Sequence, residues 1–320
     1  MEYFLVTILL LVSLLAYFKI ANRYNIIDKP NLRSAHTIPT LRGGGIIYWI
    51  AFLMFFVQTC PENSYLFIAI TMVSIVSFID DIQTLPNKIR LLTHFSAIAL
   101  VFVSLNIFSI FPPWLIIVAF ILFVGIINAY NFMDGINGIT GCYTIVVLSS
   151  LLYVNFFVLN FVQNNLIIYP IIASFVFLFF NFRKKAKCFA GDIGSISIAF
   201  WILYLILKLM VATNSVIWIL FLTIYGADTI CTIIHRLYLR ENIFVAHRHH
   251  FYQILCNDLK VDHRIVAFFY AFFQFKVSVF VIYFYDKLNI YLIFFAVIFP
   301  FILIYLTKFI ILKKVNARLL

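Results

Sequence analysis

Long apolar segments follow one another along almost all of this 320-residue chain, and they restrict its fold more than any other feature. A transmembrane helix needs about 20 consecutive apolar residues to cross the hydrocarbon core of a bilayer. Within lipid, a helix satisfies its own backbone hydrogen bonds, which an irregular segment cannot do. The sequence therefore predicts an all-α, polytopic bundle of about eleven transmembrane helices, at roughly 3–20, 43–60, 64–80, 89–108, 113–130, 138–160, 165–182, 193–210, 214–235, 264–285 and 289–312.

Composition supports a membrane protein and argues against other classes. Hydrophobic residues make up 65% of the chain and charged residues 11%, whereas a soluble domain carries about 25% charged residues. No linker or internal repeat divides the sequence, which predicts a single integral membrane domain over residues 1–320. The first apolar segment lacks the basic start and the small-residue cleavage site of a signal peptide. The five cysteines form no CxxC pair and indicate no disulfide framework.

The positions of lysine and arginine predict the orientation. Of the 23 Lys and Arg residues, all except Lys208, Lys276 and Lys287 belong to the C-terminus or to the connections after apolar segments 1, 3, 5, 7 and 9, with their helix ends. The positive-inside rule makes this face cytoplasmic and places the N-terminus outside. The formal net charge of +11 is then a topology signal that anionic membrane lipids help to hold. We expect no nucleic-acid binding, because no soluble basic domain is present to carry it.

Polar clusters on this same face contain the candidate site residues, and the first is Asp80-Asp81 at the end of the third segment. Adjacent carboxylates repel each other and lose hydration at a membrane edge, and a cation or a proton would relieve both costs. We favour a functional pair over a simple helix stop. Lys88 and Arg90, which begin the next segment, either contact a phosphate or anchor the helix.

The most specific stretch lies between residues 128 and 138. Three amides and one carboxylate recur there at intervals of three, at Asn128, Asn131, Asp134 and Asn137. On a continuing helix these side chains would lie near one face, and their oxygens suit a hard cation such as Mg²⁺. Two glycines in the same stretch, Gly135 and Gly138, would let the backbone approach a ligand or break the helix. An ordinary Asn/Gly-rich loop is the plainer alternative.

Two more acids and a histidine-rich loop complete the set. Asp192, in Gly191-Asp-Ile-Gly-Ser195, either caps a helix or holds a metal. Asp228 lies inside the ninth segment, as a functional group or as the partner of a basic residue. In the loop at roughly 236–263, zinc is disfavoured because no Cys partner or HExxH helix accompanies the histidines. A loop that closes over a sugar or pyrophosphate is favoured over solvated charge.

If these clusters converge on one cytoplasmic cleft, they combine acids, amide oxygens, a metal ion and a basic rim. That set suits a nucleotide pyrophosphate. A site embedded in the bilayer also implies a substrate from the lipid, and a phosphate on a lipid tail is the natural nucleophile. The residues alone therefore indicate phosphoryl transfer between a soluble nucleotide and a membrane lipid. A transporter of lipid-linked sugar is the rival from another class, and it would use mid-membrane charges such as Asp228 and Lys276.

The same motifs resemble those of the polyprenyl-phosphate N-acetylhexosamine-1-phosphate transferases of glycosyltransferase family 4, over nearly the whole chain. The motifs that carry the resemblance are Arg33-Ser-Ala-His36 with Pro39 and Arg42-Gly-Gly-Gly45, Phe78-Ile-Asp-Asp81 with Leu85 and Arg90, Asn128 through Gly138, Gly191-Asp-Ile-Gly-Ser195, and the His/Arg loop. The resemblance implies transfer of a sugar-1-phosphate from a UDP-sugar to undecaprenyl phosphate in a bacterial cytoplasmic (inner) membrane, with release of UMP and with Mg²⁺, or alternatively Mn²⁺, as cofactor.

The resemblance also implies roles for individual residues. Asp192 and Asn131 would bind the metal, and Asp80 and Asp81 would position or deprotonate the lipid phosphate, with Asp192 as the third catalytic acid. Lys88 and Arg90 would face the lipid phosphate. The nucleotide and sugar would contact Asn128, Asp134, Asn137, His247, Arg248, His249 and His250.

The loop Ala246-His-Arg-His-His-Phe-Tyr-Gln253 is most similar to that of O-antigen initiating enzymes. This implies UDP-FucNAc, UDP-QuiNAc or a related UDP-N-acetylhexosamine as donor, and a role in lipopolysaccharide synthesis. UDP-GlcNAc, as in enzymes that begin teichoic acid or common antigen synthesis, is the close alternative, and a peptidoglycan role is disfavoured. The sequence leaves the oligomeric state open, a homodimer included.

Overall fold

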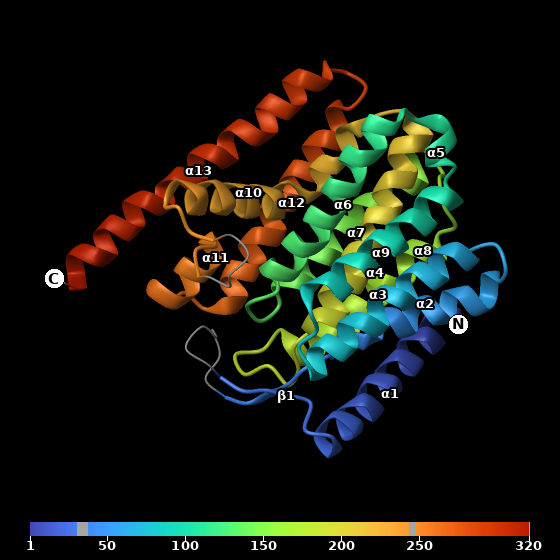
Figure 1. Cartoon of the computed structure of the whole chain (residues 1–320), viewed down its shortest axis with the longest axis horizontal. Coiled ribbons are helices and arrows are strands. Elements are labelled where there is room, and N and C mark those ends of the chain that lie inside the picture. The colour runs from blue at the N-terminus through green and yellow to red at the C-terminus, as the bar shows by residue number, and fades with distance from the viewer. Residues whose placement is uncertain (31–37, 243–247, 320) are drawn as a thin grey trace.

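The computed structural model describes residues 1–30, 38–242 and 248–319, and over these ranges the chain is a helical bundle with one two-stranded hairpin (Figure 1). Strands β1 (Ile27–Asp28) and β2 (Thr40–Leu41) pair antiparallel. The helices are α1 (Glu2–Arg23), α2 (Ile46–Thr59), α3 (Ser64–Ile82), α4 (Asn87–Ser104), α5 (Ile107–Ile110), α6 (Pro113–Met133), α7 (Ile139–Phe157), α8 (Asn165–Asn181), α9 (Gly191–Thr213), η1 (Val216–Leu222), α10 (Thr223–Tyr238), α11 (Phe251–Gln253), η2 (Ile254–Asp258), α12 (His263–Phe284) and α13 (Ile290–Leu319).

Every predicted apolar segment coincides with one of these helices, and the all-α membrane fold is confirmed. Among the described residues, 8 helices are long and apolar enough to cross a membrane. Helices α2 and α8 are apolar but shorter, and α4 begins with the polar run Asn87-Lys-Ile-Arg90. The predicted ninth segment is the 3₁₀ helix η1 continued by α10. The count of eleven spans and their orientation stay predictions.

Helix α9 forms the centre of the bundle. In its most apolar window 72% of the residues are buried, compared with 17% in α13 at the periphery. Its beginning lies against the beginning of α2, because two glycines meet there. A Cβ atom on Gly45 would come within 2.1 Å of the Gly194 Cα, and one on Gly194 within 2.6 Å of the Gly45 Cα. This close approach brings the residues just before α2 beside the first turn of α9.

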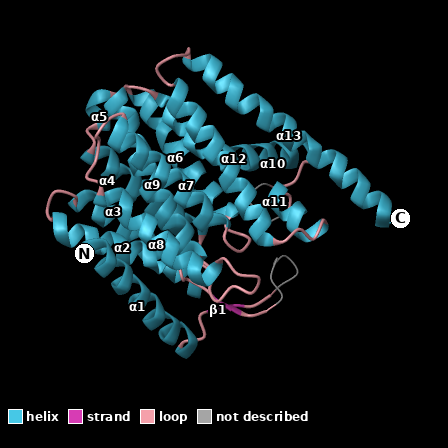
Figure 2. Cartoon of the chain, turned by 180° about the vertical axis from the view of Figure 1, so that it is seen from behind, coloured by secondary structure: helices cyan, strands magenta, loops and turns pink. Residues whose placement is uncertain are grey.

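Backbone hydrogen bonds join the hairpin to the segment that precedes α9. The Phe189 N–H donates to the Leu41 carbonyl at 2.8 Å, and the Gly44 and Gly45 N–H groups donate to the carbonyls of Phe189 and Ala190 at 2.8 and 2.9 Å. Figures 1 and 2 show this hairpin at one end of the bundle, beside the connection between α8 and α9. Loops remote in sequence are therefore held together at a single end of the protein.

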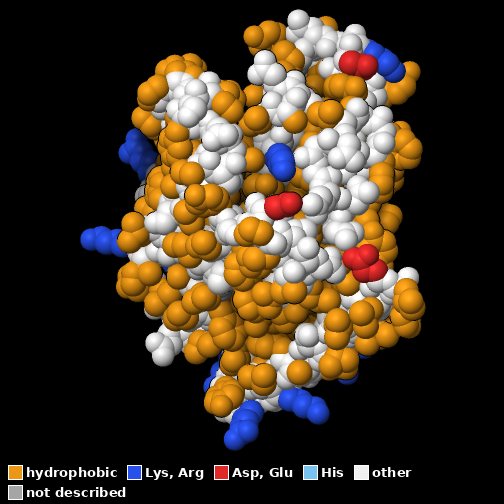
Figure 3. Space-filling view, turned by 90° about the vertical axis from the view of Figure 1, so that its right-hand side faces the viewer, with side chains coloured by type: hydrophobic (Ala, Val, Ile, Leu, Met, Phe, Trp, Pro, Cys, Tyr) orange, Lys and Arg blue, Asp and Glu red, His pale blue; other side chains and the backbone are white. Residues whose placement is uncertain are grey.

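The lateral surface of the bundle is predominantly apolar. In the face shown in Figure 3, hydrophobic side chains cover most of the surface between a few charged groups. The exposed side chains include Ile117, Ile121, Leu122, Phe175 and Phe179 from two of the membrane helices. Such a surface is expected where helices contact lipid rather than water. The five cysteines are free thiols in the structure.

Candidate active site

Asp81 connects the end of α3 to the beginning of α9. Its carboxylate accepts hydrogen bonds from the backbone N–H groups of Asp192, at 2.8 Å, and Ile193, at 3.1 Å. These are N–H groups that the first turn of a helix leaves without intrahelical partners. The contact requires glycine at position 191, where φ is +72° and a Cβ atom would come within 2.4 Å of the Asp81 Oδ2. The Asp81 carboxylate thus holds the N-terminus of α9, which carries Asp192.

Asp80 points to a different set of partners. Its Oδ1 accepts a hydrogen bond from the Leu85 N–H at 2.6 Å, and its Oδ2 lies 3.2 Å from the Arg90 Nη1. Its carboxyl group also lies within hydrogen-bonding reach of the Asp192 carboxyl group. Asp80 and Asp81 are each only 8% exposed. Two carboxyl groups in contact at a buried site require a shared proton or a cation.

Two arginines hold the three acids together. The Arg42 Nε lies 2.7 Å from the Asp81 Oδ1, and its Nη2 lies 3.3 Å from the Asp192 Oδ1. Arg90 joins Asp80 to Asp192, with its Nη2 3.6 Å from the Asp192 Oδ2. Burial alone would lower the pKa of the Arg42 guanidinium, but the Asp81 and Asp192 carboxylates outweigh burial and raise the pKa. Arg42 therefore remains a cation, and each of the two arginines bridges two carboxylates.

The stretch from residue 128 to 138 lies beside this cluster, although not as one helical face. The Ser195 hydroxyl, one turn after Asp192, donates to the Asn131 Oδ1 at 2.7 Å. Helix α6 ends at Met133, so Asp134 follows the helix and accepts a hydrogen bond from the Thr140 hydroxyl at 2.6 Å. Burial, with a smaller contribution from Asp192, raises the pKa of the Asp134 carboxyl to about 6. The chain turns through Gly135 and Gly138 before α7 begins, as the helix-breaking alternative for these glycines predicted, so the polar side chains do not share one helical face.

The donor set fits a divalent cation. Four carboxylates (Asp80, Asp81, Asp134 and Asp192) interact with only two guanidiniums, which leaves a formal charge of −2. Over the described ranges, no three His, Cys, Asp or Glu side chains form a ready metal-binding cluster. Mg²⁺ is commonly held by one or two carboxylates together with substrate phosphates. Asp192 and the Asn131 amide oxygen can supply protein ligands of that kind.

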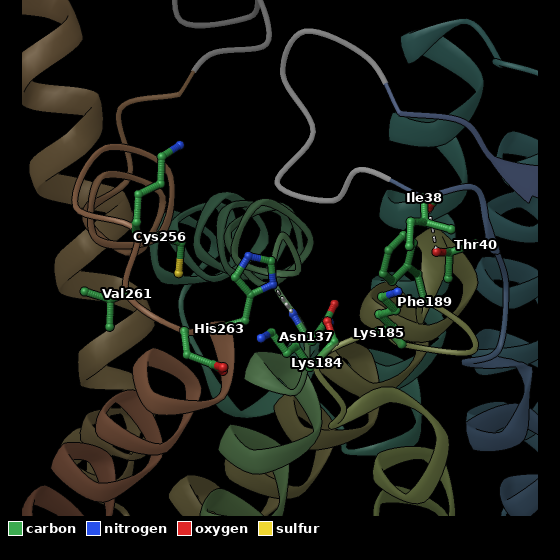
Figure 4. A pocket seen from close by; sticks show the side chains of 12 residues that line it. Ile38, Thr40, Asn137, Lys184, Lys185, Phe189, Cys256, Val261 and His263 are labelled. Atoms are coloured by element: carbon green, nitrogen blue, oxygen red, sulfur yellow. Dashed lines mark hydrogen bonds between the residues drawn. The ribbon is translucent and has the colours of Figure 1, made fainter.

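A basic cavity of about 470 Å³ is lined by residues that lie close in sequence to the carboxylates (Figure 4). Three chain segments contribute residues both to the lining of the cavity and to the cluster of acids and arginines. Thr40 lines the cavity two residues before Arg42, Phe189 three residues before Asp192, and Asn137 three residues after Asp134. The remaining lining side chains include three lysines, Lys184, Lys185 and Lys260, together with Asp262 and His263. This arrangement offers an aromatic surface and positive charge to an anionic ligand that reaches toward the acids.

Asn137 fixes the floor of the cavity rather than presenting a free amide. Its Nδ2 donates to the Arg183 carbonyl at 2.8 Å, and its backbone N–H donates to the His263 Nδ1 at 3.5 Å. Figure 4 shows the His263 ring directed toward Asn137. The residue therefore joins the loop after α6 to the basic segment before α9 and to the start of α12.

The other predicted residues are placed differently. Asn128 donates to the Val124 carbonyl within its own helix at 2.8 Å, and Lys88 is exposed. His247 and the motif Arg33-Ser-Ala-His36 lie outside the described residues. Arg248 is exposed, whereas His250 is buried and its Nδ1 lies 3.3 Å from the Asp228 Oδ1. Of the two alternatives for Asp228, pairing with a basic residue is the one that matches its contact with His250.

Sequence reasoning did not assign a site role to Arg42 or to the lysines of the cavity. Arg42 has an informative context, because a lone arginine before three glycines precedes a membrane helix. The glycines permit the close contact with α9 that carries the guanidinium to Asp81 and Asp192. Lys184 and Lys185 were counted only as part of a basic run that indicates topology.

The chain is similar to known proteins over the segments that contain these acids. The family model described as glycosyl transferase family 4 matches residues 63–210, which contain Asp80, Asp81, Asp192 and the stretch 128–138. The chain is 25% identical over 283 residues to the probable undecaprenyl-phosphate N-acetylglucosaminyl 1-phosphate transferase of Bacillus subtilis strain 168, covering 82% of this chain and 75% of that protein.

Two further relatives match over comparable parts of the chain. The undecaprenyl-phosphate alpha-N-acetylglucosaminyl 1-phosphate transferase of Escherichia coli K12 is 26% identical over 230 residues, 64% of this chain and 61% of that protein, so the match spans less than two thirds of its length. The phospho-N-acetylmuramoyl-pentapeptide-transferase of Thermotoga neapolitana is 26% identical over 255 residues, 73% of this chain and 80% of that protein. Together with the shared acidic motifs, these matches show that the chain is similar to the membrane-embedded transferases of glycosyl transferase family 4.

Proposed function

We propose that this protein transfers N-acetylhexosamine-1-phosphate from a UDP-sugar to undecaprenyl phosphate and releases UMP, on the cytoplasmic face of a bacterial inner membrane. The observation that carries the proposal is the meeting of Asp80, Asp81 and Asp192 around two arginines, beside a basic cavity and within a bundle whose sides face lipid. Relatives named for transfer to undecaprenyl phosphate support the choice of acceptor. An extended lipid acceptor can then reach the site from the bilayer and a nucleotide from the cytoplasm.

The reaction is a phosphoryl substitution. An oxygen of the lipid phosphate forms a bond to the phosphorus that carries the sugar, and the bond from that phosphorus to the oxygen shared with the UMP phosphate breaks. UMP leaves with that oxygen, and the product is undecaprenyl diphospho-sugar. In a transfer of this kind, the protein contributes mainly positioning and neutralisation of charge.

The geometry separates the tasks of the adjacent acids. Asp81 is engaged by two backbone N–H groups and Arg42, so it orients the first turn of α9 and with it Asp192. Asp80 has fewer donors and contacts Arg90 and Asp192. We assign Asp80 to hold the lipid phosphate or accept its proton, with Arg90 as the cation that steers the phosphate. A Mg²⁺ ion held by Asp192 and Asn131, when bound, would neutralise charge on the donor pyrophosphate.

The cavity is proposed to receive the uridine nucleotide. Phe189 offers a ring for base stacking, and Lys184 and Lys185 offer charge to the phosphates. The similarity of the His loop favours UDP-FucNAc or UDP-QuiNAc as donor and O-antigen initiation as the biological role. UDP-GlcNAc is the alternative, and the names of the relatives from Bacillus subtilis and Escherichia coli favour it.

The proposal is tested by UMP release from purified protein with a panel of UDP-N-acetylhexosamines, with and without undecaprenyl phosphate and Mg²⁺. We expect release that requires both. Asp192→Asn should reduce kcat by at least about a hundredfold, in keeping with the loss of a group that stabilises transition-state charge. Asp286→Asn, which changes an exposed acid between α12 and α13, is the matched control. No acceptor-dependent release with any donor would refute the function, and transport of lipid-linked sugar without UMP release would favour the transporter.

A further inference from the structure

Helix α13 contains a buried cation where a lipid-facing helix should have none. Only 17% of its membrane window is buried, yet Lys308 is 0% exposed. It is also the one charged residue in the sequence from 290 to 309. An ionisable group in a membrane helix is costly and is retained where it has a partner or a task. The family model ends at residue 210, so it assigns nothing to this helix.

The contacts of Lys308 lead to the His-rich loop. Its ammonium group donates to the His249 carbonyl and, at 2.6 Å, to the Tyr305 hydroxyl. The Tyr305 hydroxyl shares a hydrogen bond of 2.9 Å with the Thr232 hydroxyl of α10. Thr232 also lies 3.2 Å from an oxygen of Asp228. A chain of polar contacts therefore joins α13 to α10 across the interface between them.

Asp228 holds the same loop from the other side. Its carboxylate accepts the Phe251 N–H at 2.9 Å and the Tyr270 hydroxyl at 2.7 Å, and it lies 3.3 Å from the His250 Nδ1. The carboxylate is bound to an N–H group at the end of the segment 249–251, and the Lys308 ammonium to a carbonyl at its beginning. Three consecutive residues are thus fixed between one buried anion and one buried cation.

This fixed segment reaches the candidate active site through the next residue. The Tyr252 hydroxyl donates to the Phe132 carbonyl at 2.9 Å, between Asn131 and Asp134. Space for the ring is left by Gly135, where a Cβ atom would come within 2.1 Å of the Tyr252 oxygen. A shift of the segment 249–251 would therefore move a contact that lies against the end of α6.

We propose that Lys308 is a positioning residue, which together with Asp228 fixes the segment His249–Phe251 and, through Tyr252, the end of α6 beside the donor site. The part of this inference that concerns the donor rests on the proposed function. The part that concerns the fixed segment rests on the contacts alone. Helix α13 is on this view a support for the active site as well as a membrane anchor.

The test compares Lys308→Met with Lys276→Met, which makes the same change at an exposed position of α12. Hydrogen exchange of the peptide 248–255, measured by mass spectrometry on purified protein, reports on the Phe251 N–H without requiring activity. Loss of one charge-assisted contact should accelerate this exchange by about tenfold, equivalent to about 1.4 kcal/mol. Lys276→Met should exchange as the unchanged protein does. Equal exchange in all three proteins would overturn the proposal.

Steady-state kinetics supply the second readout. Lys308→Met should raise the KM for the UDP-sugar by about tenfold and leave the KM for undecaprenyl phosphate within about twofold, whereas Lys308→Arg should restore most of the donor affinity. If Lys308→Met does not fold, Tyr305→Phe removes one hydroxyl contact and should show a smaller change in the same direction. Equal changes in both KM values would assign Lys308 to folding and refute the positioning role. If no donor gives UMP, the proposed function fails while the exchange result still decides on the fixed segment.

Discussion

The contact between the beginnings of α2 and α9 provides a direct test of how the site is assembled, through Gly194→Ala. A Cβ atom at this position would lie 2.6 Å from the Gly45 Cα and 2.8 Å from the Ala190 Cβ. Neither neighbour is the flexible end of a side chain, so the helices must separate. Overpacking of this kind costs about 1–3 kcal/mol, and the gain in helix propensity from Gly to Ala offsets at most about 1 kcal/mol.

The same separation should affect catalysis more than stability. Arg42 lies just before the first turn of α2, and Asp192 lies in the first turn of α9. A shift between the two helices therefore lengthens the distance from the Arg42 Nη2 to the Asp192 Oδ1, which is now 3.3 Å. A misplacement of about 1 Å can cost about a hundredfold in rate. We therefore expect a moderate loss of thermal stability in detergent, together with a fall in kcat of about 10- to 100-fold.

Gly125→Ala is the matched control for this experiment. Gly125 lies within the membrane helix α6, and a Cβ atom there would meet nothing within 4 Å. This variant should be as stable as the unchanged protein, or slightly more stable, and fully active. If Gly194→Ala behaves like Gly125→Ala in both thermal unfolding and kcat, the close helix contact does not position Arg42, and this account of the site is wrong.

Three further substitutions test individual contacts. Phe189→Ala removes the aromatic wall of the cavity and should raise the KM for the UDP-sugar by about tenfold, since base stacking contributes about 1–3 kcal/mol; an unchanged KM would place the base elsewhere. Arg42→Lys keeps the charge but not the fork that joins two acids, so kcat should fall by at least about tenfold in UMP-release assays, and full activity would show that charge alone suffices. Arg90→Met should raise the KM for undecaprenyl phosphate more than Lys88→Met does, because Lys88 is exposed and Arg90 contacts Asp80 and Asp192; the reverse order would assign the lipid phosphate to Lys88.

The sequence predicted those features that depend on local patterns. Apolar length located each of the long helices in the described residues, because burial in lipid demands continuous hydrophobic segments. The acidic motifs were expected to converge, and the structure places Asp80, Asp81 and Asp192 in contact through Arg42 and Arg90. The order of the motifs in the sequence was sufficient to predict this convergence. Asp80 and Asp81 close α3 and Asp192 opens α9, and these helix termini lie on the same side of the bundle.

Features that depend on long-range packing could not be predicted in this way. The three-residue spacing suggested that Asn137 continues the helical face of Asn131, but α6 ends at Met133 and tertiary contacts decide where the chain turns. His250 is predicted to bind the sugar, but its contact with the Asp228 carboxylate could not be read from the sequence. Lys308 was counted as a residue at a helix end that indicates topology, and its burial depends on α10, 76 positions earlier at Thr232. Periodicity contains no information about such partners.

The adjacent acids Asp80 and Asp81 provide the last test, because the structure gives them unequal tasks. Neighbouring residues on a helix point about 100° apart, so Asp81 reaches the first turn of α9 while Asp80 faces Arg90. Asp81→Asn retains a single acceptor oxygen for two N–H groups and loses the ion pair with Arg42, which should lower both thermal stability and kcat. Asp80→Asn should lower kcat by at least about a hundredfold with little loss of stability, since its charge is used on the substrate.

Measuring thermal unfolding and UMP release on both variants, with Asp286→Asn as control, separates these roles. The comparison is informative because the two substitutions are chemically identical and lie one residue apart on the same helix. A structural acid loses fold and activity together, whereas a catalytic acid loses activity alone. If Asp80→Asn is the less stable of the two, or if Asp81→Asn retains full stability and loses only activity, then the assignment must be exchanged and Asp81 becomes the residue that contacts the lipid phosphate.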